Sequence, residues 1–282
     1  MTNLFSDKVV VITGAAGGIG KNLAQKFLAL GATVWAFDIN QEKLNEFLDE
    51  VSKTGQALHV RALDCRSEEK LQQARSEILA QRKRIDFWVN NAGISGLGDF
   101  SALAPRDFQK VIDINFSAVV WGTRLALEHM EEMGSGTIIN MASVAGHIAC
   151  PYLSAYSASK HAVVGFTLAL QQELKLKDSN VKVVLVSPGF VDTEMIAKGE
   201  AIGFPSWLSF TLATPDLVSD QILRAIKRGD EELYPDWFGK FLLGAHRMFP
   251  SMTRKSAKLL VARKFRDLLE GFIPSGKQSS KV

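Results

Sequence analysis

The sequence predicts an α/β protein in which helices cover both faces of a doubly wound parallel sheet. Short runs of β-branched residues alternate with amphipathic stretches along the front of the chain, which is the pattern of repeated βαβ units. A glycine-rich segment directly follows the first run and opens a helical stretch. Polar residues gather where later runs end, at the sheet edge where open α/β folds bind ligands.

The individual elements follow from hydrophobic periodicity. The expected strands are Val9 to Thr13, Thr33 to Phe37, Ala57 to Arg61, Ile85 to Asn90, Thr137 to Met141, Val181 to Val186 and Glu232 to Tyr234. The expected helices are Ile19 to Leu30, which Gly31 ends, Ser154 to Lys177, Pro215 to Lys227, and two more between Gly239 and Glu270.

Composition is that of an ordinary globular protein. Of the 282 residues, 46% are hydrophobic and 22% are charged. No run approaches the roughly 20 apolar residues of a membrane-spanning helix, and the first residues lack the pattern of a secretory signal. Cys65 and Cys150 are too few for a disulfide framework and lack the spacing of a metal site. We therefore expect a cytoplasmic protein with reduced thiols and no metal.

Two domain-level regions are predicted: a catalytic domain, residues 1–236, and a basic amphipathic extension and tail, residues 237–282. Within the catalytic domain the regular pattern loosens at about residues 190–212, where several aromatic residues occur. This stretch is interpreted as a lid over the site, with ordinary packing or a subunit contact as the alternatives.

The extension is unusually basic. Between Gly239 and Glu270, eight Lys or Arg residues stand against two acids, giving +6 in a chain of net charge +3. Apolar residues interleave with this charge, as in segments that lie peripherally on anionic membranes. Packing on the body of the protein or on another subunit is the favoured alternative. Nucleic-acid binding is not expected, because no recognised motif accompanies the charge.

The first candidate site is the segment Thr13-Gly14-Ala15-Ala16-Gly17-Gly18-Ile19-Gly20, between the first strand and the first helix. Gly14 permits a tight turn, Gly18 lets the backbone approach a pyrophosphate, and Gly20 lets the helix pack closely on the strand. The helix N-terminus offers amides and a positive dipole to phosphates. A glycine cluster alone often marks a plain turn, but its position after a strand favours dinucleotide binding.

Asp38 ends the second expected strand, 18 residues after Gly20. A carboxylate there can accept hydrogen bonds from the ribose hydroxyls of an adenosine, and it repels a 2′-phosphate. No Arg or Lys stands at Gly17, Ile39 or Asn40 to cancel that repulsion, so NAD is favoured over NADP. Lys21 and Lys43 are the two residues that could reverse this preference. A solvated strand-end carboxylate is the simpler alternative.

A second polar cluster, Asn90-Asn91-Ala92-Gly93, ends the fourth expected strand. Asn and Gly dominate ordinary turns, but the carboxyl edge of the sheet favours a ligand-binding role.

The third cluster is Ser143, Tyr156 and Lys160. Tyr156 and Lys160 are four residues apart in one helical run, so they share a face. A nearby ammonium favours the phenolate, so we expect a lowered pKa for Tyr156 and a role as general base. Ser143 ends the fifth expected strand, where its hydroxyl can hold a substrate oxygen. An isolated Tyr-x-x-x-Lys usually marks only a solvated helix face.

Together these features resemble the short-chain dehydrogenase/reductase family over Lys8 to about Pro235. The motifs that carry the resemblance are Thr13-Gly14-x-x-x-Gly18-Ile19-Gly20, Asn90-Asn91-Ala92-Gly93, Asn115, Ser143, Tyr156-x-x-x-Lys160 and Pro188-Gly189. The resemblance implies a Rossmann-type sheet of about seven parallel strands and an NAD(P)-dependent alcohol dehydrogenase or ketone reductase. It also implies a homo-dimer or homo-tetramer.

Carried over residue by residue, the resemblance implies a catalytic tetrad of Asn115, Ser143, Tyr156 and Lys160, in which Asn115 holds a water that links Lys160 to solvent. The implied cofactor-binding residues are Gly14, Gly18, Ile19, Gly20, Asp38, Asp64, Asn90, Ala92, Gly93, Tyr156, Lys160, Pro188, Gly189 and Thr193. Asp64 would contact the adenine edge, and the last three would flank the nicotinamide. Ala142 departs from the family pattern, where many members carry a second serine, but the Ser143 hydroxyl is retained.

The substrate pocket is expected to be mostly apolar. Its predicted residues are Ser143, His147, Cys150, Tyr152, Phe190 and Met195, which favour a lipophilic alcohol or ketone of steroid, retinoid or fatty type. His147 could bind a polar group, although a lone histidine in such a loop is more often a packing residue. A catalytically silent dinucleotide-binding or scaffold protein is the alternative function, because fold alone does not guarantee activity.

Overall fold

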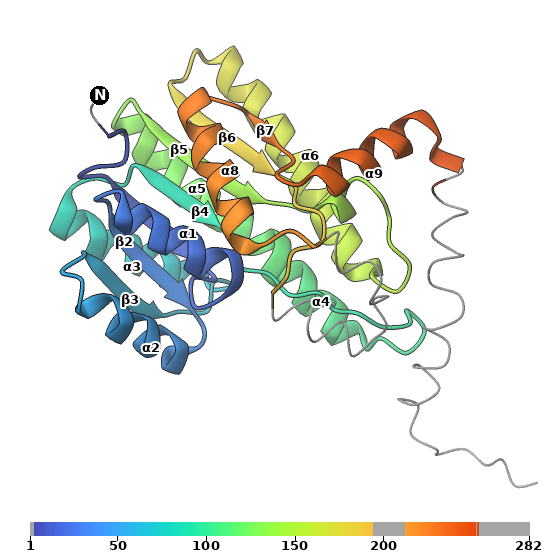
Figure 1. Cartoon of the computed structure of the whole chain (residues 1–282), viewed down its shortest axis with the longest axis horizontal. Coiled ribbons are helices and arrows are strands. Elements are labelled where there is room, and N and C mark those ends of the chain that lie inside the picture. Colours follow the sequence, from blue (N-terminus) through green and yellow to red (C-terminus); the bar gives the residue numbers. More distant parts are fainter. Residues whose placement is uncertain (1–2, 194–211, 252, 254–282) are drawn as a thin grey trace, which may run out of the picture.

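The computed structural model describes residues 3–193, 212–251 and 253. In this part of the chain a seven-stranded sheet runs in the order β3-β2-β1-β4-β5-β6-β7, and every pairing is parallel (Figure 1). Its strands are β1 (Val9–Thr13), β2 (Thr33–Asp38), β3 (Leu58–Ala62), β4 (Phe87–Asn90), β5 (Gly136–Met141), β6 (Val181–Val186) and β7 (Glu232–Leu233). The predicted doubly wound α/β fold is confirmed.

The helices flank this sheet. They are α1 (Gly18–Ala29), α2 (Gln41–Ser52), α3 (Glu68–Arg82), α4 (Pro105–Ile112), α5 (Ala118–Glu132), α6 (Ser154–Leu176), α8 (Pro215–Arg228) and α9 (Trp237–Met248). Among the described residues there are also two short turns: η1, a π-helical turn at Asp113–Ser117, and η2, a 3₁₀ turn at Val144–Gly146. In the described part of the chain none of these helices is long and apolar enough to cross a membrane.

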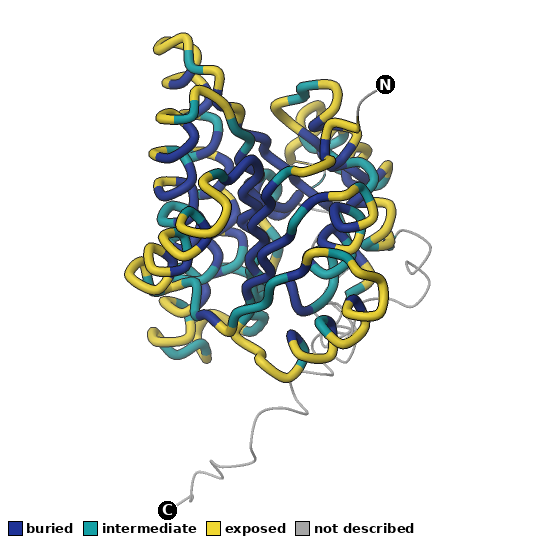
Figure 2. Tube along the Cα trace, turned by 90° about the vertical axis from the view of Figure 1, so that its left-hand side faces the viewer, coloured by how far each residue is buried: buried dark blue, intermediate teal, exposed yellow. Residues whose placement is uncertain are grey.

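The core forms on both faces of the sheet because strand side chains alternate in direction. Val10 and Ile12 of β1 pack with α1, α2 and α8 on one face. Val9 and Val11 of the same strand pack with α3 and α5 on the other. Figure 2 shows the consequence, a buried sheet between layers whose outer sides are exposed.

Helix starts show how local sequence sets these bounds. Asn40, Ser67, Thr214 and Asp236 each accept a backbone N–H of the first turn of α2, α3, α8 and α9. Helix α1 differs, because its N-cap is Gly17, which has no side chain to cap the first turn. The N-terminus of α1 therefore has backbone N–H groups without a side-chain cap, and an anion could accept hydrogen bonds from them.

The observed elements agree with the predicted ones within about two residues. The largest differences are that β4 begins at Phe87 rather than Ile85, and that α9 begins at Trp237 rather than Gly239. Most of the predicted lid and the second helix of the extension lie outside the described residues. The boundary at residue 236 stays a prediction, although α9 does begin immediately after it.

Candidate active site

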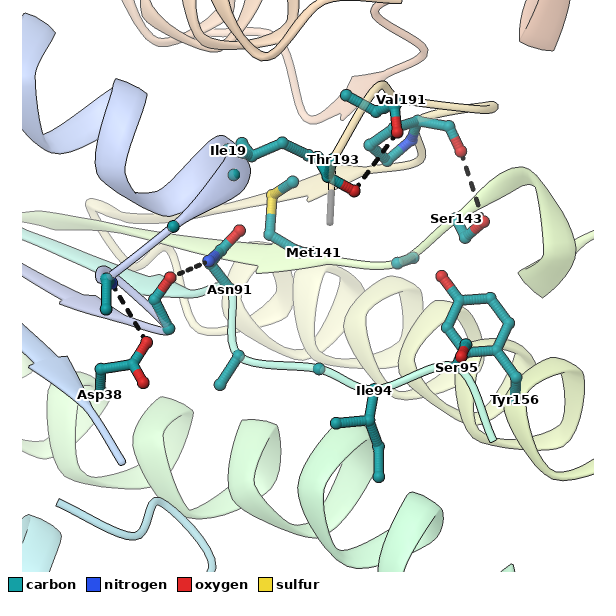
Figure 3. Close-up of a pocket in the computed structure, with 18 of the residues that line it drawn as sticks. Ile19, Asp38, Asn91, Ile94, Ser95, Met141, Ser143, Tyr156, Val191 and Thr193 are labelled. Atoms are coloured by element: carbon teal, nitrogen blue, oxygen red, sulfur yellow. Dashed lines mark hydrogen bonds between the residues drawn. The ribbon is translucent and has the colours of Figure 1, made fainter. Parts of the chain in front are cut away.

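A cavity of about 530 Å³ opens at the carboxyl ends of the central strands (Figure 3). This is the edge where open α/β sheets bind ligands. Its walls come from the ends of β1, β2, β4, β5 and β6 and from helices α1, α2 and α6. The lining residues are Gly14, Ala16, Gly17, Gly18, Ile19, Asp38, Asn40, Lys43, Asn91, Ala92, Gly93, Ile94, Ser95, Met141, Ala142, Ser143, Tyr156, Lys160, Pro188, Gly189, Val191 and Thr193.

Gly14 and Gly20 show two different reasons why this segment requires glycine. Gly14 has φ +66°, and a Cβ there would lie 2.8 Å from the Ala92 Cα. At Gly20 a Cβ would lie 2.1 Å from the Gly14 carbonyl oxygen. The loop and the helix are therefore packed backbone to backbone. At Gly17 a Cβ would meet nothing within 4 Å, so that position faces open space.

These residues fit a dinucleotide. The α1 N-terminus, with no side-chain cap, lines the same cavity as the Gly14–Gly18 loop, so that phosphates could approach the backbone directly. Asn91 supports the loop from the neighbouring strand, because its Nδ2 donates to the Gly14 oxygen at 3.0 Å and the Thr13 oxygen at 3.1 Å. Figure 3 shows this contact between Asn91 and the loop.

Asp38 stands at the far end of the cavity, fixed by backbone donors. Its Oδ2 accepts the Ala16 N–H at 3.1 Å, and its Oδ1 accepts the Asn40 N–H at 3.0 Å. The two lysines that could offset its charge differ in placement. Lys21 forms an ion pair with Glu50 at 2.8 Å and is not among the lining residues. Lys43 does line the cavity.

The two asparagines after β4 have separate surroundings. Asn90 is 3% exposed, and its Nδ2 donates to Asn140 Oδ1 at 2.8 Å and Thr123 Oγ1 at 3.1 Å. Asn90 therefore belongs to a polar network inside the sheet and does not line the cavity. Asn91, which the sequence reasoning did not assign to the cofactor, does line it. The alternation of strand side chains is the signal that could have separated them, because Asn90 shares a face with buried Trp88.

Tyr156 and Ser143 meet at the opposite end of the cavity. The Tyr156 hydroxyl faces the Ser143 side chain in Figure 3. Ser143 Oγ accepts the Ala145 N–H at 3.1 Å and donates to the Pro188 oxygen at 3.4 Å. This places one hydroxyl and one phenol side by side, ready to share a proton or to hold a common oxygen.

Lys160 lies behind the tyrosine ring and is only 4% exposed. Its Nζ donates to the Met141 carbonyl oxygen at 2.7 Å and lies 5.7 Å from the Tyr156 ring centroid. Burial lowers the pKa of Lys160 to about 8, because an ammonium loses its hydration there. The lysine is thus poised to gain or lose a proton near neutral pH.

The pKa of Tyr156 departs from our expectation. Burial raises it above its usual value, and the neighbouring Ser143 hydroxyl offsets only part of that rise. Lys160 does not produce the lowering that we expected. The physical reason is geometry, since the Lys160 ammonium is directed to the Met141 carbonyl rather than to the phenol oxygen.

Asn115 is completely buried in the π-helical turn η1, a kind of irregularity often found at functional sites. Its Oδ1 accepts the Ile94 N–H at 2.8 Å, and its Nδ2 donates to the Ile94 oxygen at 2.9 Å and to Ser159 Oγ at 3.1 Å. The side chain therefore holds the cavity wall after Gly93 in place. Its role in holding a water stays a prediction.

Several predicted site residues are absent from the cavity walls. The Asp64 carboxylate accepts from Arg66 Nη2 at 2.6 Å, and His147 Nε2 lies 3.0 Å from Ser187 Oγ. Phe190 has its ring 6.5 Å from that of Phe238. Cys150 and Tyr152 also lie outside the lining, and Met195 lies outside the described residues. His147 thus makes the kind of contact that a packing residue makes.

Asp236 is a residue that the sequence reasoning missed. It is 2% exposed, and its Oδ2 accepts the Gly189 N–H at 2.7 Å while its Oδ1 accepts the Gly239 N–H at 2.6 Å. One carboxylate thus joins the cavity wall at Pro188–Gly189 to the first turn of α9.

Comparison with known proteins gives a consistent result. A family model described as short chain dehydrogenase matches residues 8–201. Estradiol 17-beta-dehydrogenase 11 of Pongo abelii is 30% identical over 259 residues, covering 92% of this chain and 84% of that protein. Cyclopentanol dehydrogenase of Comamonas sp. (strain NCIMB 9872) is 35% identical over 190 residues, covering 67% of this chain and 75% of that protein.

Solved structures share the fold. A short chain dehydrogenase/reductase from Burkholderia phymatum in complex with NAD superposes with a TM-score of 0.76 at 24% identity, covering 92% of this chain and 96% of the other. A metagenomic short-chain oxidoreductase in complex with NADP has a TM-score of 0.68 at 27% identity, covering 81% of this chain and 96% of the other. Both nicotinamide cofactors therefore occur among these similar structures.

Proposed function

Because the chain belongs to the short-chain dehydrogenase/reductase family, we propose that it uses NAD to interconvert a lipophilic alcohol and its ketone or aldehyde. The observation that carries this proposal is the meeting of Ser143, Tyr156 and Lys160 at one end of a cavity whose other end is the glycine loop and Asp38. Cofactor site and proton-transfer groups thus share one volume.

Tyr156 is the proposed general base. In the oxidative direction its phenolate takes the proton of the substrate hydroxyl, while Ser143 holds the same oxygen. A bound oxidised nicotinamide supplies the acceptor for the hydride that leaves the carbinol carbon. In the reductive direction the Tyr156 phenol returns its proton to the carbonyl oxygen.

Lys160 is the proposed partner of Tyr156 in proton exchange. With a pKa of about 8, Lys160 can lose and regain a proton near neutral pH, so it can relay the proton that Tyr156 exchanges. Asn115 would then act by fixing the wall beside Gly93. A Cβ at Gly93 would lie 3.3 Å from Asn115 Oδ1 and 3.7 Å from Lys160 Nζ, so all three positions adjoin.

The preference for NAD rests on Asp38. Its carboxylate lines the cavity and is held by two backbone amides, so it cannot readily turn away from a 2′-phosphate. Lys21 is paired with Glu50 and offers no compensation. Lys43 is the residue whose charge opposes this preference.

The substrate class rests on two supports. Ile94, Met141 and Val191 give the catalytic side of the cavity apolar walls. The names of two relatives refer to estradiol and cyclopentanol, both secondary alcohols on rings. We propose a ring or chain alcohol of this lipophilic kind, handled by a cytoplasmic homo-dimer or homo-tetramer.

The test is turnover by the purified chain. Secondary alcohols of increasing apolar size are offered with NAD and, separately, with NADP, and the reduced-nicotinamide absorbance band is followed. The account predicts turnover with NAD that rises with apolar size and is weaker with NADP. Cofactor binding without turnover of any alcohol or ketone would instead support a catalytically silent dinucleotide-binding protein.

A further inference from the structure

Helix α9 carries an exposed apolar stripe. Trp237, Phe241 and Met248 are 61%, 62% and 72% exposed, and their spacing of four and seven residues sets them on one side of the helix. Phe249, directly after the helix, is also exposed. Four of the nine exposed large apolar residues in the described part of the chain thus fall within thirteen consecutive positions.

The opposite side of α9 packs against the rest of the protein. Gly239 and Leu243 are buried, and Asp236 ties the first turn to Gly189. In Figure 1 the helix extends away from the layered body, at the edge of the molecule beyond β7. The stripe therefore faces outward from a helix whose first turn is tied to the catalytic domain through Asp236.

Positive charge borders the stripe. Lys240 and Arg247 are seven residues apart and exposed, so both lie along the same flank of Trp237, Phe241 and Met248. Residues 237–251 contain no Asp or Glu. An aromatic and apolar stripe beside cations is the composition of a helix that lies in a membrane interface.

We propose that this face of α9 binds an anionic lipid surface, with Trp237, Phe241 and Met248 inserted at the boundary between headgroups and acyl chains. Lys240 and Arg247 then lie at headgroup level, beside lipid phosphates. A second copy of the chain is a poorer occupant, because it would bring two such basic faces together. The proposal does not depend on the substrate class.

The contact also has a geometric consequence for the cavity. Because Asp236 joins the start of α9 to the Pro188–Gly189 wall, a helix lying on the lipid surface would hold the catalytic domain close to it. An apolar substrate dissolved in that surface would then need only a short path to the site.

The test is sedimentation of the full chain with vesicles of phosphatidylcholine alone and of phosphatidylcholine mixed with phosphatidylserine. The wild type should sediment with the anionic vesicles at low salt and less at high salt. Trp237→Ser, Phe241→Ser and Met248→Ser should each weaken the partition about tenfold. Lys240→Gln with Arg247→Gln should remove much of the dependence on anionic lipid.

Two matched controls are available at exposed apolar residues far from α9. Leu176→Ser and Phe100→Ser remove side chains that are 86% and 68% exposed and should leave vesicle binding unchanged. Circular dichroism checks that each variant is folded, and turnover of any soluble substrate should be unaffected by the stripe variants.

Three results would overturn the proposal. The first is no sedimentation at low salt. The second is binding that survives all stripe changes but is lost when Arg263, Lys264 and Arg266 are neutralised, which would place the contact elsewhere in the extension. The third is a wild-type dimer, seen by analytical ultracentrifugation, that the stripe changes convert to monomer, which would make this face a contact between copies.

Discussion

The two ends of the cavity are built by different means. The binding end, around the loop after β1 and the tip of β2, depends on backbone: glycines packed against backbone atoms, an α1 N-terminus without a side-chain cap, and Asp38 held by two amides. The catalytic end, at β5 and α6, depends on side chains that are buried away from water. Substitutions that add atoms should disrupt the binding end. At the catalytic end, substitutions of similar size should leave the fold intact but abolish catalysis.

The two ends also differ in what they contribute to stability. At the binding end the carboxylate of Asp38 receives two N–H donors and keeps access to solvent. At the catalytic end Lys160 is 4% exposed, and burial shifts the pKa values of both Lys160 and Tyr156 against their charged forms. The catalytic end is therefore retained at a cost in stability, which is common at functional sites.

The largest effect is expected at Gly20. In Gly20→Ala the new Cβ would lie 2.1 Å from the Gly14 carbonyl oxygen and 2.6 Å from Asn91 Nδ2, and the Gly14 backbone cannot move aside as a flexible side chain could. We expect a loss of about 3 kcal/mol or more in the free energy of unfolding and no measurable NADH binding. Gly165→Ala is the control, because a Cβ there meets nothing within 4 Å and Gly165 lies on α6 outside the cavity lining, so this variant should bind NADH nearly as the wild type does. Equal damage from both changes would refute a backbone-packed binding end.

Lys160→Met should separate activity from stability. Turnover should fall by about a thousandfold or more, because Tyr156 loses its partner in proton exchange. The free energy of unfolding at neutral pH should nevertheless rise by about 2 kcal/mol, because a buried ammonium is replaced by a side chain of similar length. Denaturant titration measures the change, and a strongly destabilised variant would contradict it.

The difference in the free energy of unfolding between the wild type and Lys160→Met should depend on pH. Below pH 8 Lys160 is charged in both the folded and the unfolded chain, so the wild type bears the full burial cost. Between about 8 and the ordinary value of 10.5 the unfolded chain holds the proton that the folded chain has lost, and wild-type stability gains relative to the variant. The advantage of Lys160→Met should therefore shrink as pH rises through this window, as repeated titrations would show.

Asp38→Asn should change cofactor preference by a smaller amount. Loss of the charge removes one strong acceptor for ribose and the repulsion of a 2′-phosphate. We expect NAD binding to weaken about tenfold and the ratio of NADP to NAD affinity to rise at least as much, measured by titration with each reduced cofactor. Lys21→Met is the control and should leave both affinities unchanged, because Lys21 is paired with Glu50.

The smallest effect concerns Asp236, which links the catalytic end to α9. In Asp236→Asn one of the two accepting oxygens becomes an NH₂ group that faces another N–H donor. We expect a loss of about 1–2 kcal/mol in stability and a several-fold fall in kcat, with the affinity for NADH nearly unchanged. A change in NADH affinity larger than the change in kcat would assign this carboxylate to the binding end.

Much of this architecture could be predicted from sequence because it is local. The β-branched run Val9–Thr13 and the apolar spacing from Ile19 to Leu30 specify a strand and a helix whatever lies around them. The order of motifs then identified the family that the comparisons show. The positions of Gly14, Asp38, Ser143 and Tyr156 at one cavity follow from the same pattern, because parallel strands end at one edge.

What could not be predicted depends on contacts between distant segments. Strand alternation predicts that Asn90 and Asn91 point to opposite sides, but the buried network that Asn90 joins is formed with Thr123 and Asn140 of distant elements. The raised pKa of Tyr156 depends on its burial in the folded chain, which the spacing of Tyr156 and Lys160 does not reveal. Asp236 reaches Gly189, 47 residues earlier, only because β7 pairs with β6.

The central claim is that binding and chemistry reside at separate ends of one cavity, and Tyr156→Phe tests it most directly. The change removes only the phenol oxygen, so NADH affinity, measured by fluorescence titration, should stay within about threefold while turnover falls by a thousandfold or more. Retained turnover would contradict the role of Tyr156 as the base. Loss of NADH binding together with turnover, in a variant still folded by circular dichroism, would contradict the separation of the two ends.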